Sequence, residues 1–189
     1  MFLVGFILLL CDGAFSQLPG FGACPDVEVV QDFNMTMYLG EWFEIQKYVS
    51  FSELLEKCVT ASYSKNEDHS TKVIYKQMNV LTSKQTTIEA WSNFVDTPQI
   101  GKFYVDIPGQ KLAEHFLLDT DYHNYAVVFT CNDIALLNAV SVWIWARQRK
   151  PSVAVLEKAY KVLDKYNLSR SALIKTDQKK CPNESKKHL

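Results

Sequence analysis

The sequence predicts an all-β domain, an antiparallel barrel or sandwich of eight short strands with one amphipathic helix after them. The first observation is a series of strand-like runs at close spacing, separated by turn signals such as Pro108-Gly109. The second is a change of period after Pro151, where apolar residues recur at helical spacing. The third is a set of four cysteines beyond an apolar leader, typical of a secreted domain with two disulfides.

The leader is an apolar run from Phe2 to Leu10, followed by small residues at Ala14 and Ser16. This pattern predicts a secretory signal over 1–16, although no Lys or Arg precedes the run. The run is too short to span a bilayer. Residues 17–189 are then expected to form a single domain. The whole chain has 20 basic and 21 acidic side chains, and this balance gives no support for a nucleic-acid partner.

The strands are expected to follow an extended arm that covers 18–33 and contains Cys24-Pro25. A polar turn at 65–70 separates the second strand from the third, and the polar residues 121–124 separate the sixth from the seventh. Alternating apolar and β-branched residues define each run. The expected strands are 42–48, 58–64, 72–79, 86–94, 102–107, 112–119, 125–131 and 139–146.

The helix is expected after Pro151, because Val155, Ala159 and Leu163 lie on one face at helical spacing. A single amphipathic helix that follows a set of strands should pack its apolar stripe on the outside of the sheet. Residues 171–176 are compatible with a further short strand. The chain shows no internal repeat.

Three motifs stand in a characteristic order along the chain. Gly40-Glu41-Trp42 opens the first strand, Thr120-Asp121-Tyr122 lies between the sixth and seventh strands, and Arg147 ends the eighth. In order and separation, these motifs resemble the three signature regions of the lipocalin family. Ala23-Cys24-Pro25-Asp26 and the four-cysteine layout resemble, more specifically, apolipoprotein D and the insect bilin-binding lipocalins.

This resemblance implies an eight-stranded antiparallel up-and-down barrel, closed at one end, with the helix outside and an apolar ligand inside. A fatty acid, a sterol-like molecule or a bilin would fit the family. The resemblance also implies that Trp42 plugs the closed end and that Arg147 lies across its ring, a cation–π contact worth roughly 0.5–2 kcal/mol. Gly40, Thr120, Asp121 and Tyr122 would then be structural residues of the closed end.

The cysteines alone allow three connectivities between two disulfides. The family resemblance favours Cys24 with Cys131 and Cys58 with Cys181. The first pair would join the N-terminal arm to the seventh strand, and the second would join the C-terminal tail to the second strand.

Alternation along the eighth strand predicts part of the cavity. If Arg147 points inward, Trp145, Trp143 and Ser141 share its face. Trp143 is then far enough from the closed end to touch a ligand. Two further candidates, with no anchor to fix their faces, are Tyr104 and Phe116.

Alternation from Trp42 places Glu44, Gln46 and Tyr48 inward on the first strand, unless a bulge interrupts it. A buried carboxylate needs a partner or a raised pKa. Glu44 is therefore expected either to contact the polar end of a ligand or to bond within the closed-end network, and we favour the second.

Binding is expected in preference to catalysis. A lipocalin-type enzyme would need a free thiol inside the barrel, and the four cysteines are expected to be paired. The histidines show no metal-ligand spacing and no partnership with a nucleophile, so no metal site is predicted. They are His69, His115, His123 and His188.

Two loops at the expected open end carry large apolar side chains, which loops seldom do. Either these side chains fold inward as a lid, or they form an apolar rim that touches membranes, lipoprotein particles or a partner. The residues are Phe51, Leu54 and Leu55 in one loop and Ile134, Leu136 and Leu137 in the other.

Three glycosylation sequons begin at Asn34, Asn167 and Asn183. For Asn34 an alternative is equally open, because its side chain is also suited to capping the turn that leads to Gly40.

Overall fold

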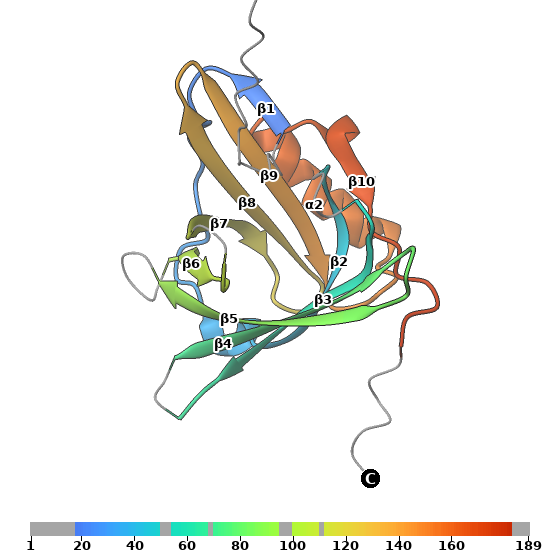
Figure 1. The fold of residues 1–189 in the computed structure, drawn as a ribbon. Coiled ribbons are helices and arrows are strands. Elements are labelled where there is room, and N and C mark those ends of the chain that lie inside the picture. Colours follow the sequence, from blue (N-terminus) through green and yellow to red (C-terminus); the bar gives the residue numbers. More distant parts are fainter. Residues whose placement is uncertain (1–17, 50–53, 68–69, 95–99, 110–111, 183–189) are drawn as a thin grey trace, which may run out of the picture.

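The chain forms a closed antiparallel barrel (Figure 1). The computed structural model describes residues 18–49, 54–67, 70–94, 100–109 and 112–182, so the signal over 1–16, Phe51 and Asn183 lie outside the described residues. Eight consecutive strands pair in sequence order, and the first also pairs with the last. They are β2 (Gly40–Tyr48), β3 (Glu56–Lys65), β4 (Thr71–Asn79), β5 (Gln85–Phe94), β6 (Lys102–Asp106), β7 (Ala113–Thr120), β8 (Tyr125–Ile134) and β9 (Leu137–Ala146). The predicted barrel is confirmed, and the sandwich alternative is wrong.

The barrel wall carries an apolar layer on each of its two faces. Val127 and Val128 are neighbours on β8 and both are buried, yet they belong to different cores. Val128 packs inside the barrel with Trp42 and Leu117, whereas Val127 packs outside it with Leu163 of the C-terminal helix. Because successive side chains point to opposite faces, a wall buried on both sides reads as a continuous apolar run.

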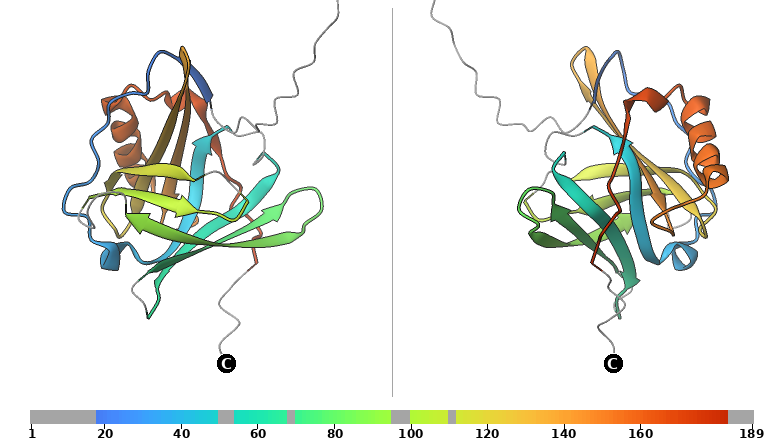
Figure 2. Two further views of the ribbon diagram at one scale, coloured as in Figure 1. Left: turned by 60° about the vertical axis from the view of Figure 1, so that its left-hand side comes forward. Right: turned by 90° about the vertical axis from the view of Figure 1, so that its right-hand side faces the viewer.

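The C-terminal helix α2 (Val153–Lys165) covers the outer face of β7 and β8, as Figure 2 shows. Ser152 caps its N-terminus, since Oγ accepts a hydrogen bond from the Val155 amide at 3.3 Å. Ala159 and Leu163 of its apolar stripe are completely buried against the sheet. The predicted helix and its position outside the barrel are therefore confirmed. Among the described residues, no helix has the length and apolar character needed to cross a membrane.

Short elements extend the barrel at both ends of the chain. The predicted arm begins as β1 (Leu18–Phe21), which pairs antiparallel with the open-end half of β9. One turn of helix, α1 (Met35–Tyr38), precedes Gly40. After α2, a 3-10 turn, η2 (Arg170–Ala172), leads into β10 (Leu173–Lys175), which pairs with the last residues of β2. The further strand considered over 171–176 is thus present.

The two disulfides join Cys24 to Cys131 and Cys58 to Cys181, so the predicted connectivity is confirmed. They close loops with sequence separations of 107 and 123 residues. Loops of that length correspond to about 4–5 kcal/mol of lost chain entropy in the unfolded state, before strain and residual structure are considered. Cys58 lies early in β3 and Cys131 late in β8, and both positions are in the half of the barrel away from Trp42.

Candidate functional site

One end of the barrel is filled by Trp42, whose side chain is fully buried. Arg147, which follows β9, lies across it with the guanidinium carbon 3.7 Å from the ring centroid. The indole Nε1 donates to the Tyr38 carbonyl at 2.9 Å. The guanidinium nitrogens donate to four backbone carbonyls, those of Met37, Tyr38, Glu41 and Tyr122. One arginine thus joins α1, β2 and the β7–β8 turn, and these contacts support the structural role expected for both residues.

Gly40 is required where α1 turns into β2. Its φ is +98°, and a Cβ there would lie 3.2 Å from Nη1 of Arg147. Asn34 caps α1, because its Oδ1 accepts a hydrogen bond from the Met37 amide at 3.2 Å. The capping alternative for Asn34 is therefore present in the structure. A glycan attaches to Nδ2 rather than to Oδ1, so the cap does not compete chemically with the sugar.

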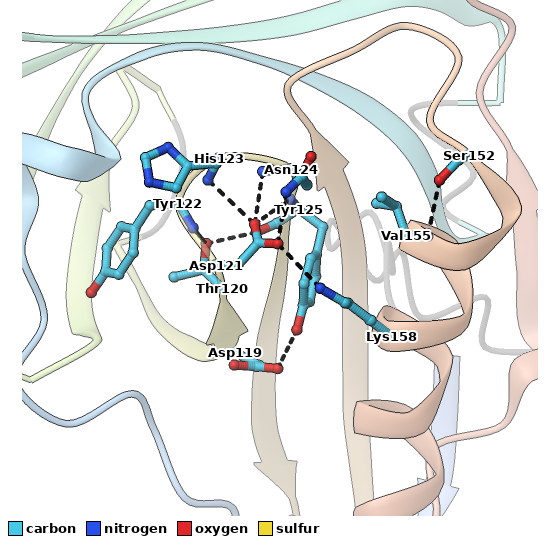
Figure 3. Close-up of polar contacts among 10 residues, drawn as sticks. All are labelled: Asp119, Thr120, Asp121, Tyr122, His123, Asn124, Tyr125, Ser152, Val155 and Lys158. Carbon is cyan, nitrogen blue, oxygen red and sulfur yellow. Dashed lines mark hydrogen bonds and ion pairs between the residues drawn. The ribbon is translucent and has the colours of Figure 1, made fainter.

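The turn between β7 and β8 is organised by the carboxylate of Asp121 (Figure 3). Oδ1 accepts from the amides of His123, Asn124 and Tyr125, at 3.2, 2.7 and 3.2 Å. Lys158 of α2 approaches Oδ2 to 3.7 Å. Burial alone would raise the pKa of Asp121, but the hydrogen bonds from Asn124 and Tyr125, together with Lys158, outweigh it and hold the pKa below its usual value.

Thr120 and Tyr122 complete this turn. The Thr120 hydroxyl donates to the Tyr125 carbonyl at 2.6 Å and accepts from the Tyr122 amide at 2.9 Å. The Tyr122 hydroxyl in turn accepts from the Asn34 amide at 3.1 Å. All these groups are used by the fold itself, so the closed end offers a floor for a ligand and little free hydrogen-bonding capacity.

A bulge at Ile45 reverses the alternation of β2. Glu44 lies opposite Trp145 of β9, but Gln46 lies opposite Ile144, the next residue along. Two residues of β2 thus match one step of β9, and every later side chain of β2 changes face. Trp145 packs in the inner core and Ile144 in the outer one, so Glu44 points into the barrel and Gln46 out of it.

The expectation that Gln46 and Tyr48 face the interior is therefore wrong. Oε1 of Gln46 accepts a hydrogen bond from the Tyr160 hydroxyl of α2 at 2.8 Å. Tyr48 packs in the outer core beneath the same helix. The inward position after the bulge belongs to Lys47, which lies opposite Trp143.

Glu44 and Lys47 form an ion pair inside the barrel, with Nζ 3.0 Å from Oε1 and about 3% of each side chain exposed. The Thr176 hydroxyl also donates to Glu44 at 2.6 Å. A buried carboxylate with two such partners is compensated by the protein. Glu44 thus has protein partners, as favoured, but they lie in β2 and the C-terminal tail and not in the closed-end network. Lys47 was not among the predicted site residues, because nothing in the sequence of β2 indicates the bulge that turns it inward.

An aromatic group lies beside this ion pair. Trp143 shares the inward face of β9 with Trp145, as alternation from Arg147 predicted. The His115 ring on β7 lies 5.9 Å from the Trp143 ring and 5.8 Å from that of Phe103 on β6, the latter pair within 8° of parallel. His115 was also missed, since no motif fixes the face of β7 and its pairing with β8 shifts register between Leu117 and Asp119.

His115 and Tyr75 line the interior space. Burial lowers the pKa of His115 to about 4 and raises the pKa of Tyr75 well above its usual value, so both side chains lie deep in the protein. Each nevertheless keeps part of its accessible surface. For inward-pointing side chains, that surface faces the inside of the barrel. Tyr75 hydrogen-bonds to Tyr63, and Tyr63 to Tyr38, so a row of hydroxyls leads down to the closed end.

Tyr104 and Phe116 lie on the outer face, so their assignment to the cavity is wrong. Tyr104 stands between Phe103 and Val105, which both pack in the inner core, and therefore points the other way. Phe116 packs in the outer core, with its ring 6.0 Å from that of Phe129. Sequence alternation gave no way to choose between the faces of these two strands.

The loops opposite the closed end expose apolar side chains. Leu54, Leu55, Ile134, Leu136 and Leu137 are all exposed, Leu136 to 85%. This favours the rim over an inward-folded lid. Backbone hydrogen bonds from Gly22 to Leu136 and from Val80 to Leu55 connect neighbouring loops, and in Figure 1 the β8–β9 hairpin projects beside β1. Further exposed apolar residues that had not been predicted are Phe21 at the end of β1, Val80 and Leu81 between β4 and β5, and Leu112 between β6 and β7.

The described residues hold no group of three or more His, Cys, Asp or Glu arranged to bind a metal ion. The cysteines within the described ranges, Cys24, Cys58, Cys131 and Cys181, are all in disulfides. A thiol nucleophile is therefore missing from the part of the barrel that the structure describes.

Comparison with known proteins agrees with this architecture. The model of the lipocalin / cytosolic fatty-acid binding protein family matches residues 39–180. Apolipoprotein D of Cavia porcellus is 33% identical over 192 residues, which cover 95% of this chain and 99% of that protein. The bilin-binding protein of Pieris brassicae is 33% identical over 128 residues, 66% of each chain.

A solved structure of apocrustacyanin C1 superposes with a TM-score of 0.78 at 21% identity, covering 90% of this chain and 97% of the other. At that identity the likeness shows a shared fold. The family match spans the barrel from its closed-end motif to the tail beyond β10. This chain therefore belongs to the lipocalin family, and within it resembles apolipoprotein D.

Proposed function

We propose that this protein is a secreted carrier that holds a small hydrophobic molecule inside the barrel. Lipocalins generally bind such ligands. The observation that carries the proposal is the group of inward side chains above a sealed floor, Trp143, Tyr75 and His115, which keep accessible surface although they lie deep in the barrel. Aromatic rings offer a large apolar area for contact with a ligand. Fatty acids, sterol-like molecules and bilins are the candidate classes, and the likeness to a bilin-binding protein supports the last.

Secretion is supported by the apolar leader and by the two disulfides. Disulfides of this kind form and persist in oxidising compartments. A secreted chain would also be open to glycosylation at Asn34 and Asn167, which are both exposed. The sequon at Asn183 is the third candidate.

Native mass spectrometry with an absorbance scan tests the carrier function on protein purified from its own source. We expect a population heavier than the disulfide-bonded chain by the mass of one small molecule, and visible absorbance if the ligand is a bilin. Denaturation should release the extra mass. Protein that is always free of ligand, and that binds none of the three classes when they are added, would contradict the proposal.

A second function is favoured by the exposed mouth. The apolar rim, defined as Leu54, Leu55, Ile134, Leu136 and Leu137, lies at the end of the barrel opposite Trp42. We propose that the rim docks on a membrane or lipoprotein surface while ligand is exchanged. Each large apolar side chain moved from water into lipid contributes about 1.5–3 kcal/mol, so two or three together give measurable attachment.

Liposome co-sedimentation of a variant with Leu54, Leu55, Leu136 and Leu137 replaced by serine tests the docking. We expect bound protein to fall to near background. Val153→Ser is the matched control, because Val153 is 75% exposed but lies at the N-terminus of α2, away from the mouth. Unchanged partitioning of the fourfold variant would rule the rim out, and an equal loss in the control would mean that attachment is unspecific.

A further inference from the structure

The hydrogen bonding of His115 defines which of its ring nitrogens is protonated. Nδ1 lies 3.0 Å from the carbonyl oxygen of Ala113. A carbonyl only accepts hydrogen bonds, so Nδ1 must carry the proton in this contact. Burial lowers the pKa of the ring to about 4, which keeps it neutral at physiological pH. In the neutral ring with a protonated Nδ1, Nε2 bears a lone pair and is an acceptor.

Nε2 has no hydrogen-bond partner among the described residues of the barrel. The flat sides of the ring are occupied by aromatic neighbours, Phe103 in a nearly parallel stack and Trp143 at a tilt of 30°. The inward charges of Glu44 and of Lys47, which lies opposite Trp143, are paired with each other at 3.0 Å. Nε2 of His115 is therefore a neutral acceptor set among aromatic surfaces.

We infer that the bound molecule carries an N–H or O–H group that donates to Nε2 of His115, while its apolar body lies against Trp143. This inference rests on the proposed carrier function and narrows its ligand class. A ligand without a donor would cover Nε2 and remove it from water with nothing in exchange, which is unfavourable for a polar group. The selectivity therefore arises from the penalty on wrong ligands as well as from the hydrogen bond itself.

The need for a hydrogen-bond donor separates the candidate ligand classes. A fatty-acid anion has only acceptor oxygens, so its head group cannot satisfy Nε2 and is disfavoured beside it. Apolar molecules with a hydroxyl or a pyrrole-type N–H near the middle of their length can donate a hydrogen bond to Nε2. The preferred ligand is thus a mostly apolar molecule with an internal hydrogen-bond donor, and a saturated fatty acid is a poor one.

Two matched fluorescent probes test this on the full-length disulfide-bonded protein. 1-Pyrenol and 1-methoxypyrene share one apolar body, and only the first has a donor. We expect the wild-type protein to bind 1-pyrenol about five- to tenfold more tightly, the difference that one net hydrogen bond makes. His115→Phe keeps a ring between Phe103 and Trp143 and removes the acceptor, so the two probes should then bind equally.

Two further variants control for structural effects. His115→Gln restores an acceptor in a different shape and should recover part of the preference. His123→Phe changes an exposed histidine in the closed-end turn and should leave the full preference intact. In addition, the ¹⁵N resonance of His115 Nε2 should move upfield with 1-pyrenol and stay in place with 1-methoxypyrene.

The outcomes distinguish this inference from the function on which it rests. If wild-type protein binds both probes equally, or if His115→Phe keeps the full preference, the donor requirement is wrong while the carrier function stands. If neither probe binds the wild-type protein, the carrier function fails and the inference falls with it.

Discussion

The two ends of this barrel are built on opposite principles. At the closed end, half-buried polar groups are satisfied by the fold: Arg147 donates to four carbonyls across Trp42, and Asp121 accepts from three successive amides. Toward the mouth, apolar side chains are exposed, and the wall is tied by two disulfides instead. Satisfied polar networks specify one rigid geometry, whereas exposed apolar loops leave surface free for a partner. The closed end serves stability, and the other half is free to serve binding.

Breaking the covalent ties of the open half should have the largest effect on stability. Replacing Cys58 and Cys181 together by serine frees the tail that carries Thr176 and Gln178 between β2 and β3. We expect the free energy of unfolding to fall by about 2–5 kcal/mol, the usual range for a native disulfide in a small secreted domain. Urea unfolding measures the loss, and an unchanged midpoint would contradict a stabilising role.

Arg147→Ala should have the next largest effect on stability, lowering the free energy of unfolding by about 2–3 kcal/mol. The change removes the stack on Trp42 and the hydrogen bonds from the guanidinium to four backbone carbonyls. Arg149→Ala is the matched control, since that side chain also stacks on a ring, Phe43 at 4.4 Å, but on the outer face. Thermal unfolding should separate the two variants. Equal losses would mean that the closed-end plug has no special role.

The residues of the closed end could be predicted from the sequence, because each of them has a role that only one or two residue types fulfil. A positive φ beside a guanidinium selects Gly40, and a turn closed by three amides selects Asp121. The residues that line the interior could be predicted only in part. Counting alternate residues back from Arg147 predicted the inward direction of Trp143 correctly, because β9 has no bulge against β8 there. In β2, the extra residue Ile45 reverses the direction of Gln46 and Tyr48. A bulge depends on pairing between strands, and no local pattern in β2 signals it.

The pH dependence of stability should distinguish the two regions. The folded-state pKa of His115, about 4, lies below the ordinary value near 6.5, so the unfolded chain binds the extra proton between those values. The contribution of neutral His115 is complete above about pH 6.5 and is lost as the pH falls toward 4. Asp121 has a depressed pKa, so its contribution is present above its ordinary value of 3.8 and is lost only below it.

Urea unfolding at a series of pH values measures both windows. We expect a slope below about 1.4 kcal/mol per pH unit between pH 6.5 and 4, the limit for a single proton. His115→Phe should remove the slope between pH 6.5 and 4 and keep the loss of stability below pH 4. Asp121→Asn should keep the slope between pH 6.5 and 4 and reduce the loss of stability below pH 4. A slope near pH 5 that survives in His115→Phe would place the titrating group elsewhere.

We expect ligand to bind above the closed end, against Trp143, and we expect changes at the closed end to leave that binding intact. Fluorescence titration of an apolar probe into three variants tests both expectations. Trp143→Ala should weaken binding about tenfold, the equivalent of 1.4 kcal/mol of lost contact. Arg147→Ala, below its unfolding temperature, and Tyr104→Ala, on the outer face, should keep the dissociation constant within about twofold of the wild type. The same affinity in Trp143→Ala as in the wild type, or a tenfold loss in Tyr104→Ala, would contradict the account.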